Sequence, residues 1–179
     1  MGLRNKAEAL ARELHAGAVR RGTDIPYITH PEAVASKVDF YGGGEELVAA
    51  AWLHDVVEDC GREKALEKVR AACGDRVAEL VMEVTHDAGI NKAAFVAHLS
   101  RASDEGALIA ACDKYHNMHC IILAHGEVGE PVWDRFKGGR PKVIEYYTMV
   151  VPMLAWKLGR THKIHGALLG MLDILASLP

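Results

Sequence analysis

Residues 49–61, AAAWLHDVVEDCG, carry several ionisable side chains within an apolar, helix-forming stretch. The surrounding alanine, tryptophan, leucine and valine residues would make a helix apolar on nearly every side, as an internal helix must be. A buried carboxylate costs several kcal/mol unless a partner compensates its charge. The ionisable residues of the stretch are His54, Asp55, Glu58 and Asp59. They predict that a cation lies against this segment.

His54 and Asp55 are predicted to bind this cation together. In a continuous helix over residues 45–59, where each residue turns by about 100°, the four ionisable groups would share one arc. The small alanines beside them leave room for a divalent metal ion. Two ligands do not complete a metal site, so the others must come from elsewhere in the chain.

Two further segments supply candidate ligands. His30 stands directly before Pro31, which suits the first turn of a helix. Asp113 lies in an apolar helical segment with Asn117 one turn later on the same face. A plain ion pair of Asp113 with Lys114 or Arg101 is the less favoured alternative, because the surroundings are apolar. Two imidazoles and two carboxylates suit manganese, iron or zinc. The predicted metal ligands are His30, His54, Asp55 and Asp113.

The pattern of apolar residues has a helical period along most of the chain, and no long stretch alternates as a β-strand would. We therefore expect an all-α fold, a bundle of orthogonal helices. The expected helices cover residues 3–21, 31–40, 45–59, 62–73, 75–84, 91–102, 104–124, 142–158 and 163–177. The longest irregular segment is expected at residues 125–141, HGEVGEPVWDRFKGGRP, which holds four glycines and two prolines.

Composition limits the class of protein. With 179 residues, half of them hydrophobic, the chain can form one domain with a substantial core, so residues 1–179 are predicted to be a single domain. A net charge of −3 gives no basic field to recruit nucleic acid or a membrane surface. There is no membrane-length apolar run and no Cys-x-x-Cys motif, so we expect a soluble, cytoplasmic protein with reduced thiols. The oligomeric state is not fixed by the sequence, and a homodimer is left open.

Three segments carry a family resemblance. The order H…HD…D is the pattern of the HD metal-dependent phosphohydrolases. The segments HAGAVRRGTDIPYITHPEAVA (15–35), LVAAAWLHDVVED (47–59) and ACDKYHNM (111–118) resemble, in order and spacing, the hydrolase domain of RelA/SpoT-type stringent-response enzymes. The resemblance implies a single HD domain, centred on a metal, that removes pyrophosphate from the 3′ position of guanosine tetra- or pentaphosphate.

The same resemblance implies a role for individual residues. Mn²⁺ would be bound by the four ligands named above, although another divalent transition metal is left open. Glu58 and Asp59 match the acidic pair that handles the attacking water. The substrate would be a nucleotide, contacted through its base, ribose or phosphates. The matching positions are Arg20 for stacking on the purine, Arg21, Asn117 near the ribose, Lys92 facing phosphate, Tyr146 for the nucleoside, and Arg140 or Lys142 for a phosphate.

Other functions remain open from the sequence. An HD enzyme could instead be a 5′-nucleotidase, an NADPH phosphatase or a hydrolase of adenine alarmones. The Arg20 motif and the Glu58–Asp59 pair argue against the nucleotidase but do not exclude a dinucleotide substrate. A non-catalytic nucleotide-binding module would be expected to lose a ligand or the acidic pair, and this chain keeps both. An antitoxin acting on an alarmone-synthesising toxin's product would use the same chemistry.

Overall fold

The computed structural model describes residues 2–87 and 89–179, which form helices joined by short connections. In these residues the only β-type pairing is an isolated bridge between Val19 and Pro26, so the expected all-α class is confirmed. None of the described helices is both long and apolar enough to span a membrane. The elements in chain order are α1 (Leu3–Leu14), α2 (Thr29–Phe40), α3 (Glu45–Trp52), α4 (Val56–Asp59), α5 (Arg62–Cys73), α6 (Asp75–Val84), α7 (Lys92–Leu99), α8 (Asp104–Val128), the 3₁₀ helix η1 (Glu130–Arg135), α9 (Gly139–Leu158) and α10 (Ile164–Ser177).

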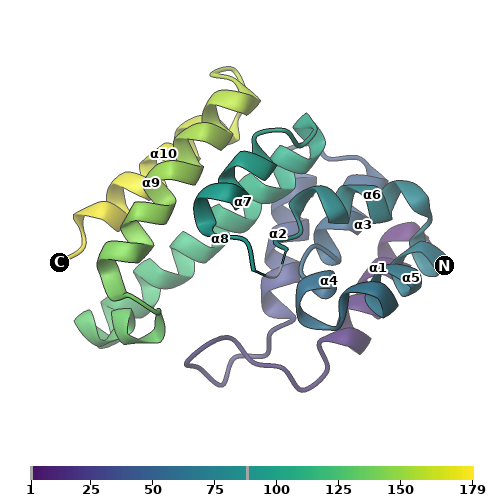
Figure 1. Cartoon of the computed structure of the whole chain (residues 1–179), viewed down its shortest axis with the longest axis horizontal. Coiled ribbons are helices and arrows are strands. Elements are labelled where there is room, and N and C mark those ends of the chain that lie inside the picture. Colours follow the sequence, from purple (N-terminus) through teal and green to yellow (C-terminus); the bar gives the residue numbers. More distant parts are fainter. Residues whose placement is uncertain (1, 88) are drawn as a thin grey trace.

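The long helix α8 joins the two halves of the molecule. It packs against α2, α3 and α6 on one side and against α9 and α10 on the other (Figure 1). The N-terminal helices α1, α3, α5 and α6 gather at one end, whereas α9 and α10 run together at the opposite end (Figure 1). Residues that project from α8 therefore face elements from both halves.

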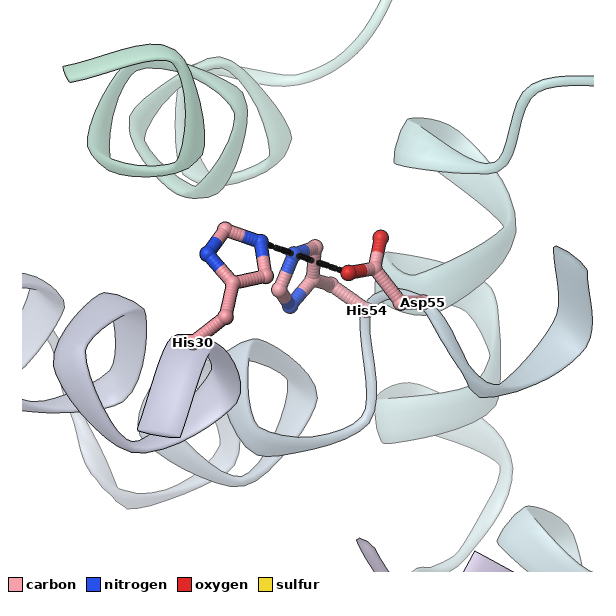
Figure 2. A group of neighbouring side chains, drawn as sticks. All are labelled: His30, His54 and Asp55. Carbon is pink, nitrogen blue, oxygen red and sulfur yellow. Dashed lines mark hydrogen bonds and ion pairs between the residues drawn. The ribbon is translucent and has the colours of Figure 1, made fainter. Parts of the chain in front are cut away.

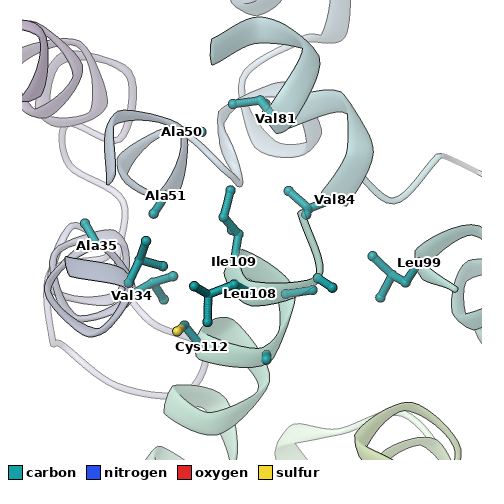
Figure 3. Packing of buried hydrophobic residues seen from close by; sticks show 14 of the residues in the cluster. Val34, Ala35, Ala50, Ala51, Val81, Val84, Leu99, Leu108, Ile109 and Cys112 are labelled. Atoms are coloured by element: carbon teal, nitrogen blue, oxygen red, sulfur yellow. The ribbon is translucent and has the colours of Figure 1, made fainter. Parts of the chain in front are cut away.

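Small side chains let α2, α3 and α8 approach one another. Ala50 and Ala51 of α3 are fully buried, and Figure 3 shows Ala51 facing Val34 of α2 with Ile109 of α8 close by. Burying a branched aliphatic side chain such as Ile109 contributes about 1.5–3 kcal/mol to folding. This packing fixes the relative positions of the three segments that carry the predicted metal ligands.

The helix expected over residues 45–59 is interrupted, so that prediction was wrong in its continuity. Helix α3 ends at Trp52, a turn covers residues 53–55, and α4 begins at Val56. The His54 side chain explains the break, because its Nδ1 donates to the Ala51 carbonyl at 2.8 Å. In an uninterrupted helix that carbonyl would accept from the Asp55 amide. The turn, and not a shared helical arc, brings His54 and Asp55 to the same place.

Two other expected helix ends differ from the structure by four residues or more. The first helix ends at Leu14 rather than at residue 21, because the chain turns at Gly17 with φ +78°. The following loop is held by backbone hydrogen bonds such as that from the Tyr27 amide to the Ala18 carbonyl at 2.8 Å. Helix α8 runs to Val128, and η1 occupies part of the segment that was expected to be irregular. The loop and η1 both line the candidate site.

Candidate metal centre and active site

Three separate elements bring the predicted ligands together. His30 lies in the first turn of α2, His54 and Asp55 lie in the turn before α4, and Asp113 lies on α8. Figure 2 shows the side chains of the first three directed toward one another. The Nε2 atoms of His30 and His54 are 3.2 Å apart, and Asp55 Oδ2 lies 3.3 and 3.2 Å from them, respectively.

Asp113 approaches this group from helix α8. Its Oδ1 lies 3.2 Å from His30 Nε2 and 3.9 Å from His54 Nε2. Its other carboxylate oxygen pairs with Lys114 of the same helix. The ion pair that the sequence offered as an alternative to ligation therefore exists beside the cluster, and it uses a different oxygen.

The hydrogen bonds of the cluster test whether a metal fits it. A carbonyl can only accept, so His54 Nδ1 must carry the proton, and in the neutral ring Nε2 presents a lone pair. The cluster then gathers acceptor atoms that repel one another unless a proton or a metal ion lies between them. Adjacent ligands on a metal with bonds of about 2.0–2.2 Å are roughly 3 Å apart, close to the spacing here. The donor set fits a divalent metal.

The raised pKa of His54 also indicates that the cluster stabilises positive charge. Burial lowers the pKa of this imidazole, but the carboxylates of Asp55 and Asp113 outweigh burial and raise it to about 9. Burial raises the pKa of Asp113, and the charges of Lys114 and the neighbouring histidines hold it well below its usual range. Burial also raises the pKa of Asp55, but the charges and hydrogen bonds of His54 and His30 hold it well below its usual range, so both carboxylates are available as anions.

A cavity of about 900 Å³ opens over the cluster, which is large enough for a nucleotide. Its lining contains all four predicted ligands, both acidic residues Glu58 and Asp59, and several cations. The cationic side chains of the lining are Arg20, Arg21, Lys92, Lys114 and Arg135. Such a lining favours a polyanionic ligand.

Glu58 has the surroundings of a proton acceptor. Its Oε1 accepts a hydrogen bond from the His86 amide at 2.5 Å, which holds the side chain in the cavity. Burial raises the pKa of Glu58 to about 7, with the Asp55 charge adding to the effect. Burial also raises the pKa of Asp59. A carboxyl that titrates near neutral pH can take and release a proton at little cost.

Several predicted substrate contacts meet in the cavity. Arg20 Nη2 donates to Asn117 Oδ1 at 2.7 Å, and the guanidinium lies 5.4 Å from the Tyr27 ring centroid. Lys92 Nζ lies 4.7 Å from the ring centroid of Tyr146. The side-chain amide of Asn117 also donates to Asp113, so it connects Arg20 to a predicted metal ligand.

Arg140 and Lys142 are not brought to the site. Neither is among the described residues that line the cavity. Arg140 donates to the carbonyls of Leu178 and Ala176 at 2.9 Å each, and Lys142 forms an exposed ion pair with Glu145. Arg140 instead ties α9 to the end of α10.

Sequence reasoning missed three residues of the site. Arg135 reaches the cavity from η1, in a segment whose structure the helical pattern did not indicate. Tyr27 donates its hydroxyl to Asp55 Oδ2 at 2.7 Å. His116 lies 2.7 Å from His30, measured between the two Nδ1 atoms. The i+3 spacing from Asp113 to His116 was the available signal, because it places both on one helix face.

Residues 7–127 match the family model described as an HD domain, which covers well over half of the chain. The chain belongs to the HD domain family. A probable guanosine-3′,5′-bis(diphosphate) 3′-pyrophosphohydrolase of Synechocystis is 35% identical to this HD domain over 126 residues, which cover 65% of the chain and 16% of the relative. An Aquifex aeolicus guanosine-3′,5′-bis(diphosphate) 3′-pyrophosphohydrolase is 41% identical over 80 residues, 45% of the chain and 11% of the relative. The HD domain thus matches only a small part of each of these longer proteins.

Two solved structures share the fold. A Listeria monocytogenes protein superposes with a TM-score of 0.72 at 27% identity, over 80% of this chain and 96% of the other. A structure described as a metazoan ortholog of SpoT that hydrolyzes ppGpp superposes with a TM-score of 0.77, over 100% of this chain and 98% of the other. At 22% identity the second likeness concerns the HD fold alone. The predicted fold of the HD domain is confirmed.

Proposed function

We propose that this HD domain is a metal-dependent 3′-pyrophosphohydrolase that removes pyrophosphate from guanosine 3′,5′-bis(diphosphate)-type alarmones. The observation that carries the proposal is the cluster of two imidazoles and two carboxylates inside a cation-lined cavity. The names of the Synechocystis and Aquifex relatives support the choice of substrate. As parts of the same proposal, residues 1–179 form one domain and act in the cytoplasm, in keeping with their free cysteines.

The ion we propose is Mn²⁺, held by His30, His54, Asp55 and Asp113. A mixed set of imidazole and carboxylate ligands supports a divalent transition metal, and the high carboxylate share favours manganese over copper. The metal would lower the pKa of a coordinated water and polarise a phosphoryl oxygen.

Glu58 and Asp59 would handle the protons of the reaction. Glu58, whose pKa is about 7, would accept a proton from the attacking water and return it to the solvent. Asp59, next in the chain and also in the cavity lining, would orient the same water or a nearby phosphate. Both stand in α4, directly after the turn that presents two of the ligands.

The remaining polar residues would bind the nucleotide. The Arg20 guanidinium, already held by Asn117, offers a plane on which a purine can stack. Arg21, Lys92 and Arg135 would neutralise the phosphates, and the Tyr146 ring would contact the nucleoside. Because Arg140 and Lys142 bind elsewhere in the fold, we assign them no phosphate.

One assay tests this function against its alternatives. Purified protein with Mn²⁺ is incubated separately with guanosine and adenosine 3′,5′-bis(diphosphates), with NADPH and with nucleoside 5′-monophosphates. Products are separated by anion exchange, with Asp55→Ala as the matched inactive control. We expect pyrophosphate and guanosine 5′-diphosphate from the first substrate. Phosphate release from NADPH or the monophosphates alone would make this a different HD phosphohydrolase, and tight binding without turnover would make it a nucleotide-binding module.

A further inference from the structure

His116 lines the same cavity as the proposed metal ligands and contacts one of them, His30. It stands on α8, one turn after Asp113, and its Nδ1 is 2.7 Å from Nδ1 of His30. The two ring centroids are 4.9 Å apart, and the planes are inclined by 34°. His30 is only 1% exposed, so solvent does not replace this contact.

Two nitrogen atoms at this distance share one proton. Two N–H groups would clash, and two lone pairs would repel each other, so one ring donates and the other accepts. His30 can donate only from the tautomer that carries its proton on Nδ1. In that tautomer its Nε2 bears a lone pair, and Nε2 is the atom that faces His54, Asp55 and Asp113.

Without an acceptor at Nδ1, the other tautomer of His30 would be favoured. Its proton would then lie on Nε2, where the carboxylates of Asp55 and Asp113 stand ready to accept it at 3.3 and 3.2 Å. A protonated Nε2 cannot bind a metal. Hydrogen bonds from Nε2 to Asp55 and Asp113 therefore favour the tautomer of His30 that cannot bind a metal. An acceptor at Nδ1 favours the other tautomer, which can.

His116 can act as the acceptor of this hydrogen bond, with its own proton on Nε2. Cys120 Sγ lies 3.8 Å from Nδ1 and 3.6 Å from Nε2 of His116, so it contacts the ring without selecting either nitrogen. Cys120 follows at i+4 on the same helix, so the pair is set by α8 alone.

We propose that His116 is a positioning residue that selects the metal-binding tautomer of His30 by accepting a hydrogen bond from its Nδ1. This inference rests on the metal site of the proposed function and not on its substrate. Groups that fix the orientation and tautomer of a ligating histidine commonly change metal affinity by about 10–100-fold when they are removed.

Two substitutions of His116 separate the hydrogen bond from packing. In His116→Asn, the Oδ1 atom is bonded to Cγ as Nδ1 is in histidine, so an acceptor remains at nearly the same place. His116→Leu has a similar volume but no acceptor, which leaves the buried Nδ1–H of His30 unpaired. His119→Leu makes the same change at an exposed position of the same helix and serves as the matched control.

The test measures metal binding by the whole chain. Metal-stripped proteins are titrated with Mn²⁺ against a chelating indicator, and circular dichroism with thermal melts verifies that each variant folds. We expect wild type, His116→Asn and His119→Leu to bind within about threefold of one another, and His116→Leu to bind about 10–100-fold more weakly. In ¹⁵N-histidine NMR spectra of the zinc-loaded wild type, we expect the His30 proton on Nδ1.

Each contrary result has a distinct meaning. Wild-type affinity in a folded His116→Leu overturns the inference and leaves the proposed function untouched. Equal losses in the Asn and Leu variants also overturn it, because the acceptor would then be irrelevant. The same holds if the proton of His30 is found on Nε2 in the loaded protein. A wild-type protein that binds no divalent metal overturns this inference and the proposed function together.

Discussion

The proposed metal ligands and the cations of the cavity are held in different ways. His30, His54 and Asp113 are at most 7% exposed and belong to the interface where α2, α3 and α8 pack. Arg20 and Arg21 lie in the loop between α1 and α2, while Lys92 and Arg135 stand at helix ends. A packed core fixes side chains closely, whereas loops accept substitution. The packed core therefore fixes the geometry of the ligand cluster, whereas the loops and helix ends determine which molecules the cavity can bind.

The largest expected effect comes from the ligand cluster. Asp55→Ala should lose the metal and all measurable hydrolysis, because it removes a ligand and the partner of the Tyr27 hydroxyl. In the wild type, Mn²⁺ at about 100 times its Kd should raise the Tm by about 5–10 °C, since native-state binding then adds about 2.7 kcal/mol. EDTA should reverse this shift. Thermal melts with elemental analysis measure both, and a metal-bound, active Asp55→Ala protein would show that the cluster is not the centre.

Glu58 lies next to the cluster, and its removal should affect only the chemistry. Glu58→Gln keeps the size of the side chain but cannot take a proton, so kcat should fall by about 10²–10⁴-fold while bound metal stays near the wild-type level. The base form exists above the pKa of about 7, so wild-type kcat should rise with pH through that range. The variant should lack that rise. Loss of metal from Glu58→Gln would instead make Glu58 a ligand.

Ionisation of Glu58 should also lower the free energy of unfolding of the metal-free protein. Its folded-state pKa of about 7 lies above the ordinary value of 4.5, so folding favours the protonated form. The stabilisation is present below the ordinary pKa and is lost as the pH rises through about 7. Metal-free Glu58→Gln should therefore melt at or above the wild-type temperature at pH 8, and a lower Tm there would contradict the assignment.

Substitution of Arg20, in the loop between α1 and α2, should weaken substrate binding without slowing turnover. Arg20→Ala should raise KM by about 3–30-fold with little change in kcat, because a contact with the base is made equally in the ground and transition states. Steady-state kinetics with the 3′,5′-bis(diphosphate) substrate measure both constants. An unchanged KM would mean that Arg20 serves only to hold Asn117.

The smallest kinetic effect is expected from Arg140, which makes a matched pair with Arg135. Arg135→Ala should raise KM several-fold because the side chain lines the cavity, whereas Arg140→Ala should leave KM unchanged. Losing the two hydrogen bonds to the end of α10 should instead lower stability by about 1–3 kcal/mol. Kinetics and denaturant unfolding of both variants check this. The opposite pattern would restore Arg140 to the phosphate site.

His30 and Asp113 lie in regular helices, where helical spacing predicts which residues share a face. Spacing on α8 placed Asp113 and Asn117 on one face, and apolar neighbours marked Asp113 as buried. Periodicity did not predict the turn at residues 53–55, because that turn depends on a hydrogen bond from one imidazole to one carbonyl. Such local competition leaves the apolar pattern unchanged.

The sequence also did not show which cations of the loops and helix ends line the cavity. Which of several nearby cations reaches the cavity depends on turns rather than on spacing. Gly129 and Gly138, both with positive φ, bend the chain around η1, so that Arg135 faces the cavity and Arg140 turns toward α10. A run of basic residues in a segment with two such bends does not reveal which one points inward.

Asn117 is hydrogen-bonded to both regions, to Arg20 in the loop and to Asp113 in the cluster. An arginine can only donate and a carboxylate can only accept, so this amide has one orientation, with its oxygen toward Arg20 and its nitrogen toward Asp113. Ordering either neighbour reduces the freedom that the other must lose on binding. Thermodynamic linkage would make such coupling reciprocal: if the proposed nucleotide, by ordering Arg20, tightened binding of the proposed metal, the metal would tighten binding of the nucleotide by the same factor.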